Sequence, residues 1–324
     1  MIVNPYAERG MIRDRTAFFG RTRELSEILS RLFSMQSVSV VGERRIGKSS
    51  FLYHLTQTGS DQLGNDFLLR YLDLQSVLSS EEFYERACEL LGAEGSTHRD
   101  LERAISGKKV GLCLDEFEQA TGNPEFGADF FNVLRSFAGT GKLALVVATQ
   151  HTLSDLYRAE AIPTSPFPNI FTLLRLGPLA EDEARDLVTR PAERAGQPFT
   201  EAEASFVLGL AGAHPYRLNV ACTLLYEAKL SGRVDFTDVR LRFEEEVRNG
   251  QTAHAMRAEQ SPESKWSGTV WTIILALGSM LMAWVTAQSG NPIGLLFAVG
   301  LGLMALWLFV VDTVPTLRLR RGLR

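Results

Sequence analysis

Short apolar runs alternate with amphipathic segments through the first half of the chain. Five of these runs are predicted to form strands, over 38–41, 67–74, 110–114, 143–148 and 170–176. Apolar residues recur at helical spacing in neighbouring segments, which predicts helices over 22–33, 48–56, 80–91 and 130–137. Because strands and helices take turns along the chain, the pattern predicts an α/β domain with a largely parallel sheet.

The pattern becomes helical beyond Pro178. Helices are predicted over 181–194, 201–211, 215–230 and 238–247, with glycines at the breaks between them. The next stretch, 250–265, is polar and lacks a helical period. An irregular linker is therefore predicted at 250–265, after a small helical subdomain.

The segment 266–311 contains no charged residue and holds all four tryptophans of the chain. Its two halves, 266–287 and 293–311, are each long enough to cross about 30 Å of hydrocarbon at about 1.5 Å per residue. Residues 288–292 are predicted to form a turn between them. The alternative, a buried helical hairpin in a soluble core, is disfavoured because core helices are shorter. Two transmembrane helices are predicted.

The charges that flank the two predicted spans indicate their orientation. Lys265 precedes the first span, four arginines follow the second within a basic tail at 312–324, and the connecting turn is uncharged. By the positive-inside rule, both ends lie in the cytoplasm. The first ten residues show no signal-peptide pattern, which agrees with a cytoplasmic soluble part. Whether the spans form a pore or an anchor stays open.

The formal net charge of −4 argues against a nucleic-acid-binding surface, because neutralising phosphates needs clustered Lys and Arg. Cys88, Cys113 and Cys222 lie far apart and lack metal-binding spacing. They are predicted to be reduced thiols in the core, as expected in a reducing compartment.

A phosphate-binding loop follows the first predicted strand. Residues 42–49 read GERRIGKS and match GxxxxGK[ST], with a strand before and a helix after, as this motif requires. Main-chain N–H groups of such a loop surround phosphates, and the helix N-terminus favours negative charge. The predicted nucleotide-binding residues are Gly42, Glu43, Arg44, Arg45, Ile46, Gly47, Lys48, Ser49 and Ser50. Lys48 is predicted to contact the β and γ phosphates of ATP, and Ser49 to bind Mg²⁺.

Two carboxylates follow the predicted strand 110–114. Ligands of open α/β sheets bind at the carboxyl ends of the strands, where Asp115 and Glu116 stand. Asp115 is predicted to hold Mg²⁺ through water, and Glu116 to orient or deprotonate the attacking water. Glu118 is a second candidate for the role of Glu116. Gln150, after the strand 143–148, is predicted to sense the γ-phosphate, the alternative being an ordinary surface residue.

These motifs resemble the STAND class of signalling NTPases, within the AAA+-like P-loop ATPases. The resemblance is strongest to bacterial and archaeal members whose loop reads GxRRxGKSS. It covers residues 4–247 and rests on FGRTREL at 19–25, the phosphate loop, LDE at 114–116 and GAHPY at 212–216. It implies a three-layer α/β/α core over 1–177 and a helical lid over 178–249.

The resemblance also implies further contacts to the nucleotide. The element at 19–25 lies beside the adenine in the family, which implies that Arg21 and Glu24 are near the nucleotide. The lid element of the family is GxP, whose proline contacts the base, and Pro215 matches that proline. Ala213 stands where the family has glycine. A charge-stabilising arginine is left open among Arg158, Arg175 and Arg190.

The leading hypothesis is an ATP switch, anchored in a bacterial or archaeal cytoplasmic membrane, that hydrolyses ATP slowly. Larger STAND proteins continue into a winged-helix domain and sensor repeats, which the residues after 247 are not expected to form. The trigger is therefore expected to be a protein partner, a homo-oligomeric state or the exchange of ATP and ADP. The alternatives are an ATPase that remodels or moves a membrane partner, and a scaffold that binds nucleotide without hydrolysis.

Overall fold

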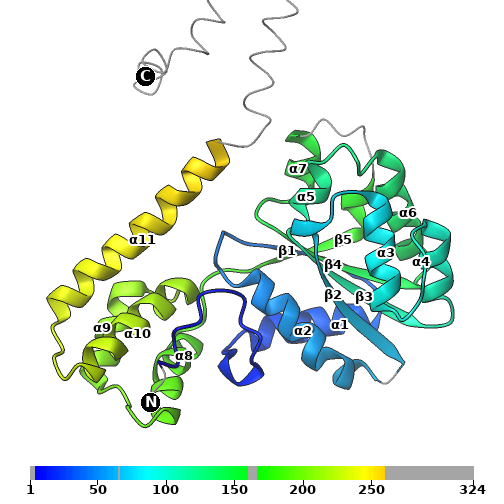
Figure 1. The fold of residues 1–324 in the computed structure, drawn as a ribbon. Helices are drawn as coiled ribbons and strands as arrows, with labels where there is room; N and C mark the ends of the chain where they lie inside the picture. Colours follow the sequence, from blue (N-terminus) through cyan, green and yellow to red (C-terminus); the bar gives the residue numbers. More distant parts are fainter. Residues whose placement is uncertain (1–3, 65, 160–165, 260–324) are drawn as a thin grey trace, which may run out of the picture. The chain divides into compact units, whose positions relative to one another are not determined.

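The computed structural model describes residues 4–64, 66–159 and 166–259 of the 324-residue chain (Figure 1). By its internal contacts the chain divides into two units, Met1–Glu244 and Glu245–Arg324. The first unit contains a five-stranded sheet and almost all of the described helices. In the second unit, the described part is the end of helix α11 (Phe236–Glu259).

The sheet is parallel throughout, as predicted. Its strands, in the order β2-β3-β4-β1-β5 across the sheet, are β2 (Phe67–Asp73), β3 (Lys109–Asp115), β4 (Leu143–Thr149), β1 (Ser37–Val41) and β5 (Phe171–Arg175). Val41 is level with Thr149, and Asp115 with Asp73. The carboxyl ends of β1, β3 and β4 therefore lie side by side along one edge of the sheet.

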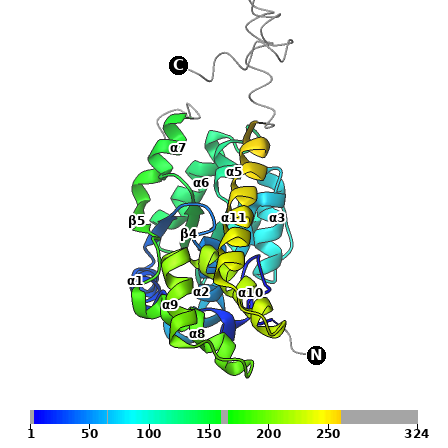
Figure 2. The same ribbon diagram turned by 90° about the vertical axis from the view of Figure 1, so that its left-hand side faces the viewer.

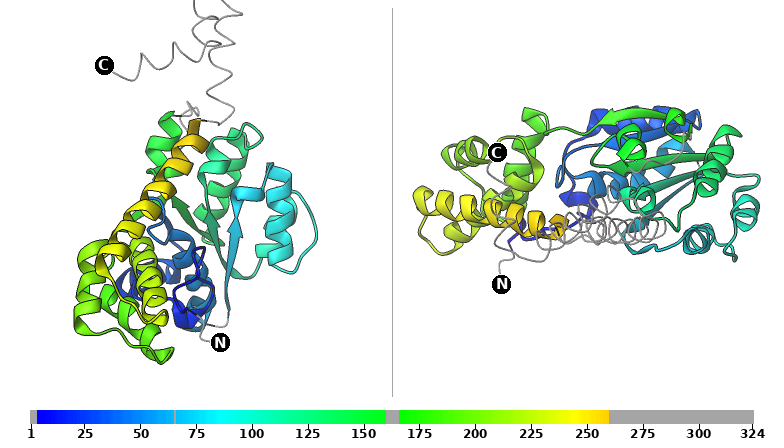
Figure 3. Two further views of the ribbon diagram at one scale, coloured as in Figure 1. Left: turned by 60° about the vertical axis from the view of Figure 1, so that its left-hand side comes forward. Right: turned by 90° about the horizontal axis from the view of Figure 1, so that it is seen from above.

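Side chains that alternate along the strands bury both faces of the sheet. The odd-numbered residues of β4 from Leu143 to Val147 pack with α3 (Ser80–Leu90), α4 (His98–Ile105) and α6 (Ala128–Gly139). The even-numbered residues from Ala144 to Ala148 pack with α1 (Thr22–Phe33) and α2 (Lys48–Leu63). The two helical layers lie on opposite faces of the sheet (Figure 3). The predicted three-layer α/β/α core is confirmed.

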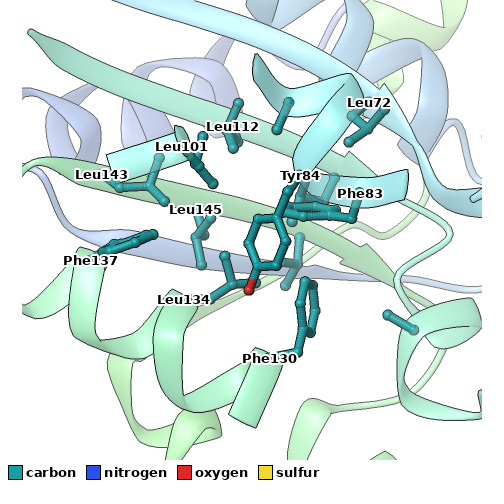
Figure 4. Packing of buried hydrophobic residues seen from close by; sticks show 14 of the residues in the cluster. Leu72, Phe83, Tyr84, Leu101, Leu112, Phe130, Leu134, Phe137, Leu143 and Leu145 are labelled. Carbon is teal, nitrogen blue, oxygen red and sulfur yellow. The ribbon is translucent and has the colours of Figure 1, made fainter. Parts of the chain in front are cut away.

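Aromatic rings fix the layer that covers the first of these faces. Phe83 and Phe130 meet edge to face with ring centroids 4.9 Å apart, and Tyr84 lies beside both (Figure 4). Edge-to-face pairs add to the stabilisation that area burial provides. The layer therefore gives the sheet a rigid backing on the side away from α2.

The helices α8 (Glu181–Arg194), α9 (Glu201–Ala211) and α10 (Pro215–Leu230) have the predicted bounds. They pack against one another as a helical group, which we call the lid (Figure 2). Helix α10 is the buried one, with Leu218, Cys222 and Leu225 fully inaccessible. The three predicted thiols are free and buried, as expected.

The N-terminal segment is anchored on the lid. The hydroxyl of Tyr6 donates to the carbonyl oxygen of Val188 and accepts the N–H of Ala192 at 3.1 Å, two groups that would pair directly in a regular helix. This insertion lies next to Pro191, which stands inside α8 without an N–H to donate. Thr223 of α10 donates to the carbonyl oxygen of Tyr6 at 2.7 Å. The N-terminal segment is thus part of the lid's packing.

Some helices were not predicted. They are α4, the four-residue α5 (Glu118–Thr121) and α7 (Leu153–Ala159), and α2 also continues beyond its predicted end to Leu63. Short 3₁₀ turns occur at Arg15–Ala17, Leu74–Ser76 and Phe167–Ile170. Helix α4 begins with a capping box of Thr97 and Asp100. That pair is a sequence signal for a helix start and would have located α4.

The prediction of an irregular linker is wrong up to Glu259, because α11 runs through this segment. Residues 251–259 are polar but consist mainly of good helix formers, and extending an existing helix is easier than nucleating one. The predicted spans 266–287 and 293–311 and the tail lie outside the described residues. Among the residues that the structure describes, no helix combines the length and apolar character needed to cross a membrane.

Candidate functional site

The phosphate-binding loop lies between β1 and α2, as predicted. Two of its residues have left-handed backbone conformations, Arg45 with φ 62° and Gly47 with φ 99°. Glycine adopts such a conformation without steric cost. Gly42 is required for a different reason, since a Cβ there would lie 2.7 Å from the carbonyl oxygen of Leu176. Local sterics thus select both glycines of the motif.

Lys48 folds back over this loop. Its Nζ donates to the carbonyl oxygens of Gly42 at 2.7 Å and Glu43 at 3.1 Å. Burial lowers the pKa of Lys48, while the negative charges of Glu118 and Glu116 act in the opposite direction. The ammonium group of Lys48 is thus surrounded by the acceptors of the candidate site.

Asp115 is held from two sides at the end of β3. It is 2 % exposed, and its Oδ2 accepts the hydroxyl of Tyr71 at 2.8 Å. Its Oδ1 accepts the N–H of Glu116 at 3.0 Å. Burial and the charge of Asp115 raise the pKa of Tyr71, so its hydroxyl stays a donor. Tyr71 was not predicted from sequence, because its contact depends on the register of β2 against β3.

Glu116 has a left-handed backbone, with φ 50°, directly after β3. A non-glycine residue in this region is uncommon and occurs where surrounding structure enforces it. Burial raises the pKa of the Glu116 carboxyl, and the charges of Asp115 and Glu118 raise it further. The turn therefore directs a partly buried carboxyl group towards the site that holds Lys48.

Glu118 connects the ends of β3 and β4. Its carboxylate accepts the main-chain N–H of Gln150, and burial raises its pKa. Gln150 itself is exposed. The contact places the main chain of Gln150 beside Glu118, and the role of its side chain as a γ-phosphate sensor stays a prediction.

The donor set at this edge of the sheet suits a magnesium-bound nucleotide. The hydroxyl of Ser49, in the first turn of α2, and the carboxylate of Asp115 are hard oxygen donors of the type that Mg²⁺ prefers. Mg²⁺ in phosphate sites is usually bound by one or two such side chains together with phosphate oxygens and water. The acidic residues around Lys48 give this edge an excess of negative charge that a divalent cation would compensate.

Two predicted nucleotide-binding residues are engaged by other parts of the chain. Ser50 is buried, and its hydroxyl oxygen accepts the N–H of Ile12 at 3.0 Å. Arg21 is buried with its guanidinium group on the carbonyl oxygens of Ile46 and Gly177. Both contacts connect the N-terminal segment to the phosphate loop or the helix that follows it.

The lid touches the phosphate loop directly through two pairs of side chains. Nε2 of His214 lies 3.2 Å from Oε1 of Glu43, and the guanidinium carbon of Arg45 lies 4.2 Å from the ring centroid of Tyr216. We call these four residues the latch. Pro215 stands between the two lid members, at the first position of α10. The sequence element GAHPY marked this place but not its partners.

The lid histidine of the latch is unusual in its surroundings. Burial lowers the pKa of His214, an effect that the charge of Glu43 opposes. Its Nδ1 is buried and has no hydrogen-bond partner among the residues that the structure describes. A buried polar atom without a partner costs free energy, typically about 1–3 kcal/mol. His214 is a functional candidate because it also contacts Glu43 of the phosphate loop.

Two of the arginines considered for charge stabilisation are paired on their own helices. Arg158 lies 3.5 Å from Asp155, and Arg190 lies 2.7 Å from Asp186. Arg175 ends β5 and is exposed. These positions do not favour any one of the three arginines as the residue that stabilises charge.

The chain is similar to known proteins in sequence and in fold. Residues 96–262 match the sequence model of the family described as novel STAND NTPase 2, a match that begins after the phosphate loop. A Walker-type ATPase of Pyrococcus abyssi has a similar structure, with a TM-score of 0.62, 15 % identity and 93 % of each chain covered. The structure of the ORC2 protein of Aeropyrum pernix, in ADPNP–ADP complexes, is also similar, with a TM-score of 0.55, 16 % identity and 73 % of each chain covered. No curated protein matches the sequence.

Proposed function

Because the chain belongs to the novel STAND NTPase 2 family, we propose that it is an ATP switch whose lid responds to the nucleotide on the phosphate loop. Nucleotide binding follows from the P-loop NTPase fold and the family. The observation that carries the switch is the latch, in which His214 and Tyr216 contact Glu43 and Arg45. Lid contacts to the loop itself give the nucleotide a direct way to move the lid.

The loop and the carboxylates have separate roles in this proposal. The main-chain N–H groups of the loop bind the phosphates, and Lys48 exchanges the carbonyl oxygens of Gly42 and Glu43 for phosphate oxygens. Ser49 and Asp115 would hold Mg²⁺, which would supply neutralisation of the phosphate charge. Glu116 accepts the proton of the attacking water, and hydrolysis to ADP resets the switch.

The latch is weak enough for phosphate to compete with it. An exposed cation–π pair contributes about 0.5–1 kcal/mol, whereas hydrogen bonds to charged groups contribute about 1.5–3 kcal/mol. A triphosphate therefore draws Arg45 away from Tyr216. The lid then loses one contact to the loop and is free to rearrange, with Pro215 oriented to the nucleotide. The change is transmitted to a protein partner or to a second copy of the chain.

The switch predicts a change in distance between the lid and helix α2 when ATP binds. Gln62→Cys on α2 and Ser205→Cys on α9 place labels at exposed positions, while the three native cysteines are buried. Pulsed electron-spin distance measurements are expected to give different distributions with ATP and without nucleotide. Adding Tyr216→Leu, which removes the cation–π pair, is expected to shift the nucleotide-free distribution towards the ATP-bound one.

The matched control for this experiment is Lys48→Ala in the same labelled chain, which should not respond to ATP. If the wild-type distances are the same with ATP, with ADP and without nucleotide, the lid does not move in response to the nucleotide. The proposed switch is then excluded. The site assignment would survive that result, because it depends on binding alone.

Membrane anchoring is the second part of the proposed function. It is supported by the uncharged segment 266–311 and by the basic residues that flank it. Expressed in bacteria, the chain is expected to sediment with membranes and to stay there during alkaline carbonate extraction. Deletion of 266–324 is expected to release it. Extraction of the intact chain by carbonate would show that the segment does not span the bilayer.

A further inference from the structure

Arg21 combines two unfavourable features in one residue. Its side chain is charged yet the residue is only 3 % exposed, and its backbone is left-handed with φ 63°. Burial of a charge is costly unless the group is fully hydrogen-bonded, and a left-handed backbone costs a further 1–2 kcal/mol, roughly. The chain retains both features at the position that precedes α1, so the contacts of this guanidinium group call for a functional explanation.

The guanidinium group joins the phosphate loop to the start of the lid. Nη2 donates to the carbonyl oxygen of Ile46 at 3.1 Å and to that of Gly177 at 2.6 Å. Nη1 donates to Glu24 at 3.1 Å and to the carbonyl oxygen of Pro178 at 3.4 Å. Ile46 belongs to the loop, whereas Gly177 and Pro178 connect β5 to α8. One rigid planar group therefore fixes two segments far apart in sequence.

The bond to Ile46 determines how the loop presents its last glycine. In a trans peptide the carbonyl oxygen and the following N–H point in opposite directions. No cis peptide occurs among the described residues, so the N–H of Gly47 points away from Arg21. The N–H groups of this loop are the donors that bind phosphates. Holding the carbonyl of Ile46 therefore orients a phosphate donor at Gly47.

The turn that carries Arg21 is itself fixed to the lid. Glu183 of α8 accepts the N–H of Thr22 and that of Ala180, both at 3.3 Å. A Cβ at Gly20 would lie 2.8 Å from Cδ of Glu183, so only glycine fits this approach. The turn 20–22 is thus held by the same lid helix that begins after Pro178. Movement of the start of α8 would displace Arg21.

We propose that Arg21 is a positioning residue, which orients the Ile46–Gly47 peptide for phosphate and couples it to the start of the lid. It acts through the main chain of the loop and does not contact the base. Arginine is required because a planar group with several donors serves four acceptors, which the single ammonium of lysine does not match. The proposal rests on nucleotide binding at the phosphate loop.

The test compares Arg21→Lys with Arg31→Lys in the purified chain. Arg31 lies on α1, the helix that follows Arg21, and contacts Gln36 and Thr172, away from the loop. The dissociation constant of ATP is expected to rise about tenfold in Arg21→Lys, the equivalent of ~1.4 kcal/mol, and to stay unchanged in Arg31→Lys. GTP binding by Arg21→Lys should weaken by the same factor, because GTP and ATP carry the same triphosphate group.

A second variant separates positioning from general stability. Arg21→Gly suits the left-handed backbone and leaves room for a free guanidinium ion. Millimolar guanidinium is expected to restore ATP affinity in Arg21→Gly without raising its melting temperature, and to have no such effect in Lys48→Ala.

Two results would overturn the proposal. Wild-type ATP affinity in Arg21→Lys would show that the peptide needs no such support. A change in the ratio of ATP to GTP affinity would show that Arg21 reads the base instead. If Lys48→Ala also kept wild-type affinity, the phosphate site itself would be wrong, which is a separate failure.

Discussion

Lys48→Ala is expected to abolish measurable ATP binding, with a loss of at least about a hundredfold in affinity. In the proposed complex the ammonium group would donate charge-assisted hydrogen bonds to phosphate, each contributing about 1.5–3 kcal/mol. Its removal also takes away the ammonium charge that offsets Asp115, Glu116 and Glu118 beside the triphosphate. These two effects act in the same direction. Isothermal titration of the variant with ATP and Mg²⁺ measures the loss.

The matched control is Lys142→Ala, an exposed lysine next to β4 at the opposite edge of the sheet. Its ATP affinity should equal that of the wild type, and both variants should keep the wild-type circular dichroism spectrum. Unchanged ATP affinity in Lys48→Ala would contradict the assignment of the phosphate loop as the nucleotide site.

Glu116→Gln is expected to slow ATP hydrolysis by about a hundredfold or more while ATP still binds. General-base catalysis contributes about 10²–10⁴ to a rate, and an amide cannot accept the proton of the attacking water. Glutamine preserves the size of the side chain, so the left-handed turn and the hydrogen bond to Asp115 should persist. Steady-state phosphate release, together with ATP titration of the same preparation, separates the two effects.

Glu118→Gln is the natural comparison, because its amide oxygen can still accept the N–H of Gln150. Only a small decrease in the rate of ATP hydrolysis is expected for Glu118→Gln. If Glu118→Gln is the inactive variant and Glu116→Gln is not, the two glutamates have exchanged roles. The wild-type rate is informative as well, since slow release suits a switch, rapid turnover suits a remodelling ATPase, and none at all suits a scaffold.

Some parts of the secondary structure can be predicted from the sequence more completely than others. The five strands and most helices follow from local periodicity, which records how each segment is buried. Helix α11 shows the limit of that approach, because the segment 251–259 is polar and has no apolar period, although its residues favour a helix. Helix α4 is specified by a local signal of another kind, its capping box of Thr97 and Asp100.

By itself, the sequence determined the parallel sheet, the phosphate loop after β1 and the acidic pair after β3. These features depend on local sterics and on strand alternation, so nearby residues specify them. The tertiary structure alone decided that Tyr71 holds Asp115, that His214 and Tyr216 contact the loop, and that Arg21 supports its main chain. Each of these contacts joins segments whose proximity is set by strand register and helix packing, and neither is recorded in the local pattern of residues.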